Sequence, residues 1–386
     1  SSIAQVVEQL VRVTIIIIGS YLSAKVFHFN LRTTVGIALS GASLGAIASY
    51  LYLLIKMKKN QSKIKFQTID IEEPKIKYQA IMKKIIIYAL PFILIDLSRS
   101  LVQTIDIFSL VKILVSNLGY DVNYAETVIS IITTWGNKLN NIVVSITTGI
   151  MVSLVPNLTT YLTENNIVEV RKKINQTIQL VIYLTIPMTI GLSFLASPVW
   201  TLFYGTSELG PQVFAFNVLT CVANSLLITT CTIALTLKEN KNLYISLITI
   251  FLLKLLLNKP LIYCCYGLAL PGYIGSIIAT MIAFIVPTIM IIIVIGKKHQ
   301  VNYEKTIKEG FNILISSLVM VILLMLLKLV IPIDVSSRLL AILLIIIYTA
   351  IGALIYIIMT KKTKTIDNIF GKNFLKKLIY NTKKEK

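Results

Sequence analysis

Long apolar runs recur at regular intervals along the chain, and few folds can accommodate this pattern. As a helix rising about 1.5 Å per residue, each run is long enough to cross a hydrocarbon core about 30 Å thick. Strands of a membrane barrel would alternate apolar and polar residues, and these runs do not. We therefore predict an all-α polytopic membrane protein with ten spans, at about residues 3–24, 34–55, 84–114, 125–162, 174–196, 212–236, 243–262, 272–296, 310–331 and 339–360.

Basic residues between the runs predict the orientation. The formal net charge is +20, which in a water-soluble chain would suggest nucleic acid, but here the charges lie almost entirely in the connections. Alternate connections hold 27 Lys and Arg residues on one side and 3 on the other. Because basic residues stay preferentially in the cytoplasm, we expect a membrane protein with both ends of this chain cytoplasmic and no nucleic-acid partner.

Motifs of soluble enzymes are missing from the sequence. There is no Walker loop for phosphate, no GxSxG nucleophile elbow and no HExxH zinc motif. The cysteines follow no metal-ligand spacing, and we interpret all four as packing residues: Cys221, Cys231, Cys264 and Cys265. We expect no metal, no cofactor and no enzymatic activity, but a transporter driven by an ion gradient, the membrane potential or substrate flux.

One apolar run holds charges in a regular order. In the segment ALPFILIDLSRSLVQTID, residues 89–106, the polar residues fall at i, i+3, i+7 and i+10 of one helix face: Asp96, Arg99, Gln103 and Asp106. A charged side chain at a helix centre costs about 2.5–3.5 kcal/mol on insertion scales, so such groups usually face a bundle interior or a wet cavity. We expect this face to point inward.

The next span repeats the pattern at i, i+4, i+7, i+11 and i+14: Thr134, Lys138, Asn141, Ser145 and Thr148. Two interpretations stay open. The two polar faces line a water-accessible cavity, or they form a satisfied ion-pair network that only holds the bundle together. In the first span, Glu8 and Arg12 at i, i+4 leave a similar choice between a local salt bridge and a cavity lining.

Other polar residues within the spans have simpler interpretations. Three of them share one helix face, which favours helix packing: Asn217, Cys221 and Asn224. Three more lie in the outer half of their span, where they are expected to snorkel to the interface: Lys254, Asn258 and Lys259. Tyrosines near span ends fit an aromatic belt, among them Tyr204 and Tyr356.

Four segments, taken in order, resemble one family. They are SSIAQVVEQLVRV opening a helix, ALPFILIDLSRSLVQTID after a basic linker, TTWGNKLNNIVVSITTGIMVSLVPNLTTYL, and LKLLLNKPLI. Their order and spacing resemble the polysaccharide-biosynthesis flippases of the MOP superfamily, and most closely the MurJ/YtgP-type lipid II flippases. The resemblance covers essentially the whole chain, and WGNKLNN departs from the RGQPL-like segment of that family.

The resemblance implies a MATE/MurJ-like two-lobe helical bundle of fourteen transmembrane helices, of which this chain would hold about ten. It would begin at the fifth helix, and the four helices before it would be absent. The implied division is 1–56 for the last two helices of the N-lobe, 57–83 for a basic cytoplasmic linker, 84–296 for a six-helix C-lobe, 297–362 for two additional helices and 363–386 for a basic cytoplasmic tail. The tail interleaves apolar residues with lysines, which fits either an interfacial helix on anionic lipid or a solvated basic terminus.

The resemblance also implies roles, because the first two helices of each lobe line a central cavity in the family. The substrate-binding candidates are Arg99, Lys138, Gln103, Asn137, Asn141 and Arg12. Among them, Arg99 and Lys138 would receive the pyrophosphate of an undecaprenyl-linked glycan, while the three carboxamides would contact sugar or peptide groups. The carboxylates that would pair with the cations, or take part in ion or proton coupling, are Asp96, Asp106 and Glu8.

The implied function is to flip an undecaprenyl-pyrophosphate-linked glycan, lipid II, the peptidoglycan precursor, across the membrane by alternating access. The partners would be this lipid-linked oligosaccharide, membrane lipids and a coupling cation or the membrane potential, with the prenyl tail in a groove beside the last two helices. One alternative is a cation-coupled multidrug exporter of the same superfamily, against which the two additional helices argue. The other is a non-transporting fragment or structural subunit.

Overall fold

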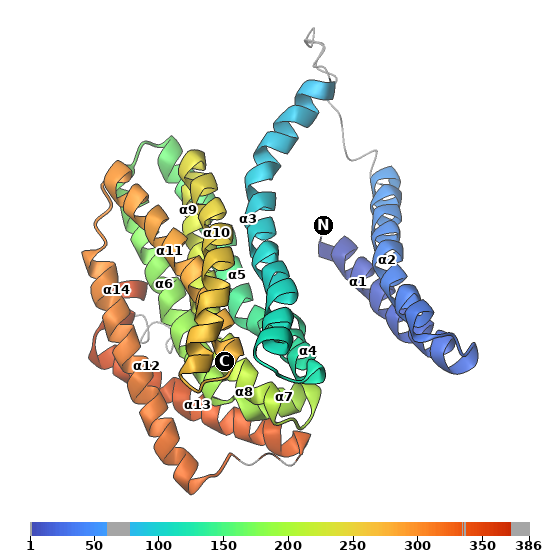
Figure 1. The fold of residues 1–386 in the computed structure, drawn as a ribbon. Helices are drawn as coiled ribbons and strands as arrows, with labels where there is room; N and C mark the ends of the chain where they lie inside the picture. The colour runs from blue at the N-terminus through green and yellow to red at the C-terminus, as the bar shows by residue number, and fades with distance from the viewer. Residues whose placement is uncertain (1, 60–77, 334, 336, 372–386) are drawn as a thin grey trace, which may run out of the picture. The chain divides into compact units, whose positions relative to one another are not determined.

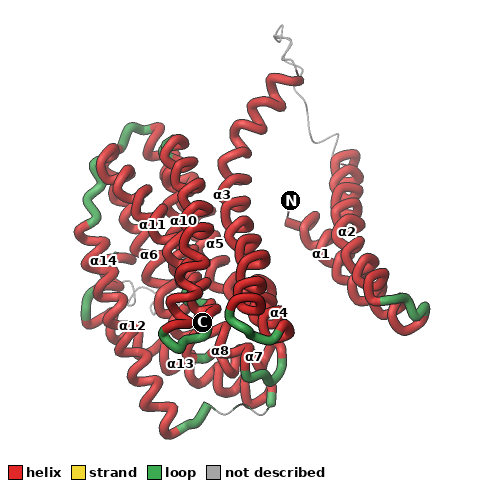
Figure 2. Tube along the Cα trace, in the orientation of Figure 1, coloured by secondary structure: helices red, strands yellow, loops and turns green. Residues whose placement is uncertain are grey.

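The computed structural model describes residues 2–59, 78–333, 335 and 337–371. Within these residues the regular elements are all helical and no strand occurs (Figure 2). The chain divides into two compact units, Ser1–Lys77 and Tyr78–Lys386, which are described separately. The predicted linker 57–83 lies outside the described residues at positions 60–77, as the predicted tail 363–386 does at positions 372–386.

Ten helices in the described part of the chain are long and apolar enough to cross a membrane, one for each predicted span. Their surfaces stay apolar where they are exposed: Phe108 is 76% exposed, Leu329 83% and Leu339 81%. Such a surface would be a liability in water but suits contact with lipid, while helices satisfy the backbone polar groups internally. The prediction of an all-α polytopic membrane protein is therefore confirmed.

The first unit is a pair of packed helical segments. One segment runs through α1 (Ser2–Thr14), η1 (Ile15–Gly19) and η2 (Leu22–Val26), where η marks a π-helical turn, and the other is α2 (Leu31–Lys59). Two glycines four residues apart on α2 let the backbones approach closely. A Cβ on Gly45 would lie 2.8 Å from the carbonyl oxygen of Glu8, and one on Gly41 would lie 3.1 Å from that of Arg12.

The second unit is one helical bundle, drawn from cyan to red in Figure 1. Its elements are α3 (Tyr78–Lys112), η3 (Ile113–Asn117), α4 (Val122–Ser130), η4 (Ile131–Trp135), α5 (Gly136–Thr163), α6 (Ile167–Phe194), α7 (Ala196–Tyr204), α8 (Leu209–Asn217), α9 (Thr220–Thr236), α10 (Asn240–Gly267), α11 (Gly272–His299), α12 (Glu304–Val330), α13 (Arg338–Lys362) and α14 (Thr365–Phe370). Helix α5 packs against α6 and α9, helix α10 against α3 and α11, and helix α12 against α6 and α13.

Two predicted spans of the second unit are interrupted. The span predicted at 125–162 is built from α4, the π-helical turn η4 and α5, and the span predicted at 212–236 is divided into α8 and α9. The connection between 197 and 211 holds a helix that was not predicted, α7, because nine residues are too short to register as a membrane span. These breaks matter for function because they lie beside the polar interior of the unit.

Candidate functional site

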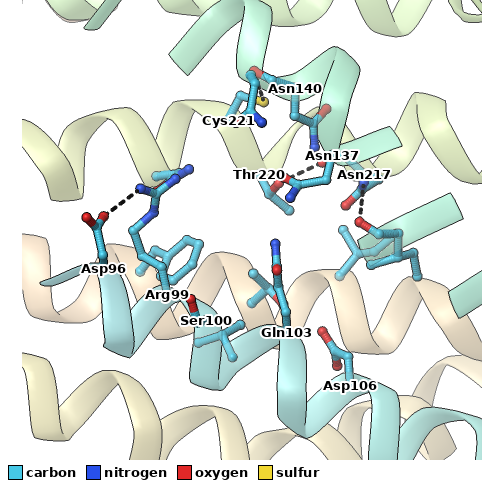
Figure 3. A pocket seen from close by; sticks show the side chains of 17 residues that line it. Asp96, Arg99, Ser100, Gln103, Asp106, Asn137, Asn140, Asn217, Thr220 and Cys221 are labelled. Atoms are coloured by element: carbon cyan, nitrogen blue, oxygen red, sulfur yellow. Dashed lines mark hydrogen bonds and ion pairs between the residues drawn. The ribbon is translucent and has the colours of Figure 1, made fainter. Parts of the chain in front are cut away.

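The predicted polar face of α3 lines a cavity. Asp96, Arg99, Gln103 and Asp106 all border it, and Figure 3 shows them along one helix together with Ser100. Residues three or four apart meet on a helix of about 3.6 residues per turn, so the helical period alone brings them together. Arg99 Nη1 lies 3.4 Å from Asp96 Oδ1, and these side chains are 28% and 79% exposed. A pair this long and this exposed is loose, which leaves the guanidinium able to take another acceptor.

A second wall of the cavity comes from α5. Asn137, Asn140 and Asn141 border the space, and Figure 3 shows Asn137 and Asn140 across the cavity from Arg99 and Gln103. Asn140 was not predicted, although it stands beside Asn141 in the sequence. Three carboxamides within one helical turn make this wall polar without giving it a net charge.

The third wall lies at the break between α8 and α9. Its polar members are Asn217, Thr220, Cys221 and Asn224. The sequence favours helix packing for Asn217, Cys221 and Asn224. Asn217 and Cys221 are indeed buried, at 4% and 1% exposed, but both also border the cavity. The break itself positions them, since Thr220 Oγ1 donates to the carbonyl oxygen of Asn217 at 2.7 Å and so caps the end of α8.

The cavity has a volume of about 320 Å³. Its lining includes six carboxamides, on Gln103, Asn137, Asn140, Asn141, Asn217 and Asn224. A carboxamide both donates and accepts hydrogen bonds, so this lining suits hydroxyl and amide groups more than it suits bare charge. The volume is at the lower end of ligand pockets in proteins, which span about 300–1,000 Å³.

Asp106 forms a buried ion pair at one end of the cavity. Its Oδ1 lies 2.6 Å from Lys254 Nζ, and the two side chains are 4% and 0% exposed. Lys254 Nζ also donates to the carbonyl oxygen of Ser276 at 2.9 Å and to the hydroxyls of Ser276 at 3.1 Å and Thr280 at 2.8 Å. The ammonium is therefore surrounded by oxygen acceptors, which a buried charge requires.

The prediction that Lys254 and Asn258 snorkel to the interface is wrong. Asn258 is 1% exposed and its Nδ2 donates to Ser109 Oγ at 2.6 Å. Both residues lie on α10 where it packs against α3, and the acidic partner of Lys254 comes from that other helix. Lys259, by contrast, is exposed, and its Nζ lies 5.9 Å from the ring centroid of Tyr263.

Lys138 and most of the second predicted stripe do not line this cavity. Lys138 is exposed, and among the stripe residues only Asn141 borders the space. The reason is rotational, because Lys138 follows Asn137 by about 100° around the helix axis. Its part in substrate binding stays a prediction.

Glu8 and Arg12 lie on α1, in the first unit, which is described separately from the unit that holds this cavity. Both side chains are half-buried. No ion pair joins them in the part of the chain that the structure describes. Their proposed roles stay predictions as well.

A second cavity, apolar and of about 380 Å³, lies among α6, α12 and α13. Two of its three tyrosines donate their hydroxyls to backbone oxygens, Tyr356 Oη to Tyr183 O at 2.8 Å and Tyr348 Oη to Ile331 O at 2.5 Å, while Tyr183 Oη lies 3.4 Å from Thr360 Oγ1. The rings therefore present mainly apolar faces. Tyr356 is only 6% exposed, so its assignment to an aromatic belt is wrong.

The two cavities meet the same helix. Asn141 borders the polar cavity and its neighbour Ile142 borders the apolar one, both on α5. The unit can thus hold a polar group and an apolar chain on adjacent sides of one helix. Within the described residues, no group of three or more His, Cys, Asp or Glu side chains is placed to hold a metal ion. Of the four cysteines, Cys221, Cys231 and Cys265 are buried inside the bundle, and Cys264 is exposed on the surface of the span that holds it.

Comparisons with known proteins agree with this architecture. Residues 124–351, more than half of the chain, match the family described as lipid II flippase MurJ. The chain is 26% identical over 381 residues to the lipid II flippase MurJ of Bacillus subtilis (strain 168), an alignment that covers 96% of this chain and 68% of that protein.

Among solved structures, the chain resembles the inward closed conformation of lipid II flippase MurJ, with a TM-score of 0.59 and 18% sequence identity. The match covers 92% of this chain and 66% of that one, so this chain spans about two thirds of the length of both relatives. At this identity the likeness shows the fold alone.

Proposed function

The chain belongs to the MurJ family of lipid II flippases, and on that premise we propose that it moves lipid II, an undecaprenyl-pyrophosphate-linked glycan, across the bacterial cytoplasmic membrane. The observation that carries the proposal is the carboxamide-lined cavity of about 320 Å³ with Arg99 at its wall, enclosed in a bundle whose outer surface is apolar. A polar head group needs such an interior to cross a hydrocarbon core.

Arg99 is the group we assign to the pyrophosphate. Its partner Asp96 is 3.4 Å away and largely exposed, so a phosphate oxygen can replace that carboxylate as acceptor at little cost. Asp106 is different, because Lys254 already neutralises it inside the bundle. Asp96 is therefore the carboxylate we assign to coupling with a cation or a proton, and Asp106 the one we assign to holding helices together.

The carboxamides are assigned to sugar and peptide groups. Gln103 from α3 and Asn137 and Asn141 from α5 face the same space, so one head-group amide or hydroxyl can meet donors and acceptors from two helices. A glycopeptide is larger than 320 Å³, so this cavity would hold only part of the head group. The prenyl tail is assigned to the apolar cavity among α6, α12 and α13, which lies on the adjacent side of α5.

Alternating access would then carry the head group from one face of the membrane to the other by rocking of helical lobes. The orientation with both ends of this chain in the cytoplasm, which the distribution of basic residues supports, is part of the proposal. In this proposal the protein is a transporter. Its residues bind and release lipid II without making or breaking a covalent bond.

The test is exposure of lipid II on the outer face of cells depleted of their own flippase and supplied with this chain. Wild type is expected to restore exposure, and Arg99→Ala to lower it about tenfold or more, the effect of losing one charged hydrogen bond. Binding of purified lipid II to the purified chain is measured in parallel. Equal binding of lipid II and of undecaprenyl phosphate, which has no sugar, would contradict the proposal.

A further inference from the structure

The wall of α5 that faces the polar cavity begins at a π-helical turn, η4 (Ile131–Trp135). There the backbone N–H of Gly136 donates to the carbonyl oxygen of Ile131, five residues back, in place of the four of an α-helix. Single π-helical turns inside α-helices are rare and frequently occur at functional sites. This one directly precedes Asn137.

The turn determines which residues reach the cavity. Ile132 and Asn137 both border it, although they are five residues apart. In an uninterrupted α-helix a spacing of five would separate them by about 140° around the axis. The wider π turn brings them into line, and Asn140 and Asn141 then follow Asn137 by three and four residues of regular α-helix.

If the same residues formed a regular α-helix instead of the π turn, α5 would present a poorer wall. Relative to α4, its face would shift by one position, from Asn137 to Gly136, from Asn140 to Leu139 and from Asn141 to Asn140. Two of the three carboxamides would be replaced by groups that form no side-chain hydrogen bonds. The π turn is therefore the feature that aligns three carboxamides on the cavity.

Side chains from other helices hold the turn in place. Tyr204 Oη, at the end of α7, donates to the carbonyl oxygen of Trp135 at 2.9 Å, and the two rings stack with centroids 6.0 Å apart. Asn217 Nδ2, at the end of α8, donates to the carbonyl oxygen of Ile132 at 3.4 Å. Both bonds go to oxygens of the π turn, where the α-helical pattern is interrupted.

Gly136 completes the arrangement. A Cβ at this position would lie 2.7 Å from the carbonyl oxygen of Ile131 and 3.1 Å from Asn217 Nδ2. Both contacts are too close, and the first is with the oxygen that closes the π turn. Only a residue without a side chain leaves room for this turn and for Asn217 together.

We infer that Tyr204, Asn217 and Gly136 are positioning residues, which hold η4 in its π-helical form and so aim Asn137, Asn140 and Asn141 at the head group. The inference rests on the proposed function for the identity of the substrate. It adds the reason why these three carboxamides, and not their neighbours on α5, face the cavity. Tyr204 acts through the hydrogen bond from its hydroxyl to the backbone oxygen of Trp135. Its assignment to an aromatic belt did not predict this role.

The test measures how accessible the wall of α5 is in the purified chain. Asn137→Cys is introduced as a reporter. We measure the rate at which a small charged thiol reagent modifies this cysteine in the purified chain. The rate for the parent chain, which has only the native cysteines, is subtracted. The rate is then compared in three backgrounds, wild type, Tyr204→Phe and Gly136→Ala. Matched controls are Tyr266→Phe, an exposed tyrosine, and Gly149→Ala, a glycine on the same helix whose added Cβ would meet nothing within 4 Å.

Tyr204→Phe is expected to slow modification of the reporter thiol about three- to tenfold, the effect of losing one hydrogen bond. Gly136→Ala is expected to slow it as well, because the added Cβ clashes with the oxygen that closes the π turn, while both controls leave the rate unchanged. Unchanged rates in Tyr204→Phe would overturn the inference, even if Gly136→Ala fails to fold. Because no substrate is present, the predicted slowing in a chain that does not bind lipid II would refute the proposed function and leave the inference standing.

Discussion

Asp106 on α3 and Lys254 on α10 form an ion pair with Oδ1 and Nζ 2.6 Å apart, and both side chains are almost fully buried. The pair joins the helix that carries the polar face to α10, and through Ser276 and Thr280 it also reaches α11. Ser276 Oγ donates in turn to Asp106 Oδ1 at 2.5 Å. The charges that make the sequence of α3 unusual therefore serve two purposes, since Arg99 faces the cavity and Asp106 fastens the helix.

The first prediction concerns the stability of this pair. Lys254→Met and Asp106→Asn should each lower the free energy of unfolding by about 3–5 kcal/mol, because either leaves a buried group without its partner. The double variant should recover most of the loss. Unfolding of the purified chain in detergent measures it, with Lys172→Met as the control, since Lys172 and Glu169 are much more exposed. Single variants that cost no more than this control would show that the pair is not coupled.

The second prediction separates the two cations proposed to meet the pyrophosphate. Arg99 lines the polar cavity and Lys138 does not. Lys138→Ala should therefore reduce lipid II exposure less than Arg99→Ala, by at least about threefold, in the same depleted cells. Equal losses would contradict this difference. They would favour the predicted polar stripe of α5, in which Lys138 faces the substrate as Arg99 does.

The third prediction concerns the apolar cavity. Ala353→Trp should fill part of its roughly 380 Å³ and weaken binding of undecaprenyl pyrophosphate about tenfold, because the tail would lose its apolar contacts. The neighbouring Leu354 is 61% exposed and does not border the cavity, so Leu354→Trp serves as the control. If the two substitutions weaken binding alike, the tail does not occupy this cavity.

The fourth prediction concerns pH and the turn between α9 and α10. Glu239 accepts hydrogen bonds from Lys298 at 2.5 Å and from Asn242 at 2.8 Å. The bond from Lys298 holds the pKa of Glu239 below its usual value of 4.5, although burial acts in the opposite sense. A carboxyl whose pKa is lowered on folding stabilises the folded state above its unfolded-state pKa, and this contribution is lost as pH falls through the folded-state value.

Wild type should therefore lose thermal stability below pH 4.5 more steeply than Glu239→Gln, which has no charge to lose. Thermal unfolding of the two chains between pH 7 and about pH 3 measures the difference, and its dependence on pH isolates this group from the other carboxylates. Curves that stay parallel over the whole range would show that the contact with Lys298 adds no stability.

Much of the fold could be predicted because a membrane constrains it strongly. Helix length and apolar composition fix the spans, since the hydrocarbon core has a set thickness and leaves no other partner for the backbone. The face of α3 was predictable for a related reason, because an uninterrupted α-helix repeats every 3.6 residues and brings Asp96, Arg99, Gln103 and Asp106 together. Both predictions depend only on local geometry.

The rest of the site depends on contacts that no local pattern encodes. The π turn η4 determines which face of α5 meets the cavity, and the sequence spacing that grouped Lys138 with Asn141 gave no sign that Asn137 and Asn140 form the wall. Lys254 pairs with a carboxylate on a helix that is distant in the sequence, and the apolar run around this lysine gives no sign of that partner. Tyr204 donates to a backbone oxygen, which every residue has, so its sequence neighbours carry no signal.

Photocrosslinking of lipid II to the wall of the polar cavity tests most directly whether the head group occupies that cavity. A photoreactive amino acid replaces either Gln103, which lines the cavity, or Phe108, which lies on the same helix but is 76% exposed on the apolar surface. We expect position 103 to crosslink the lipid II head group and position 108 not to crosslink it. Head-group crosslinks at position 108 alone, or at both positions equally, would contradict this expectation.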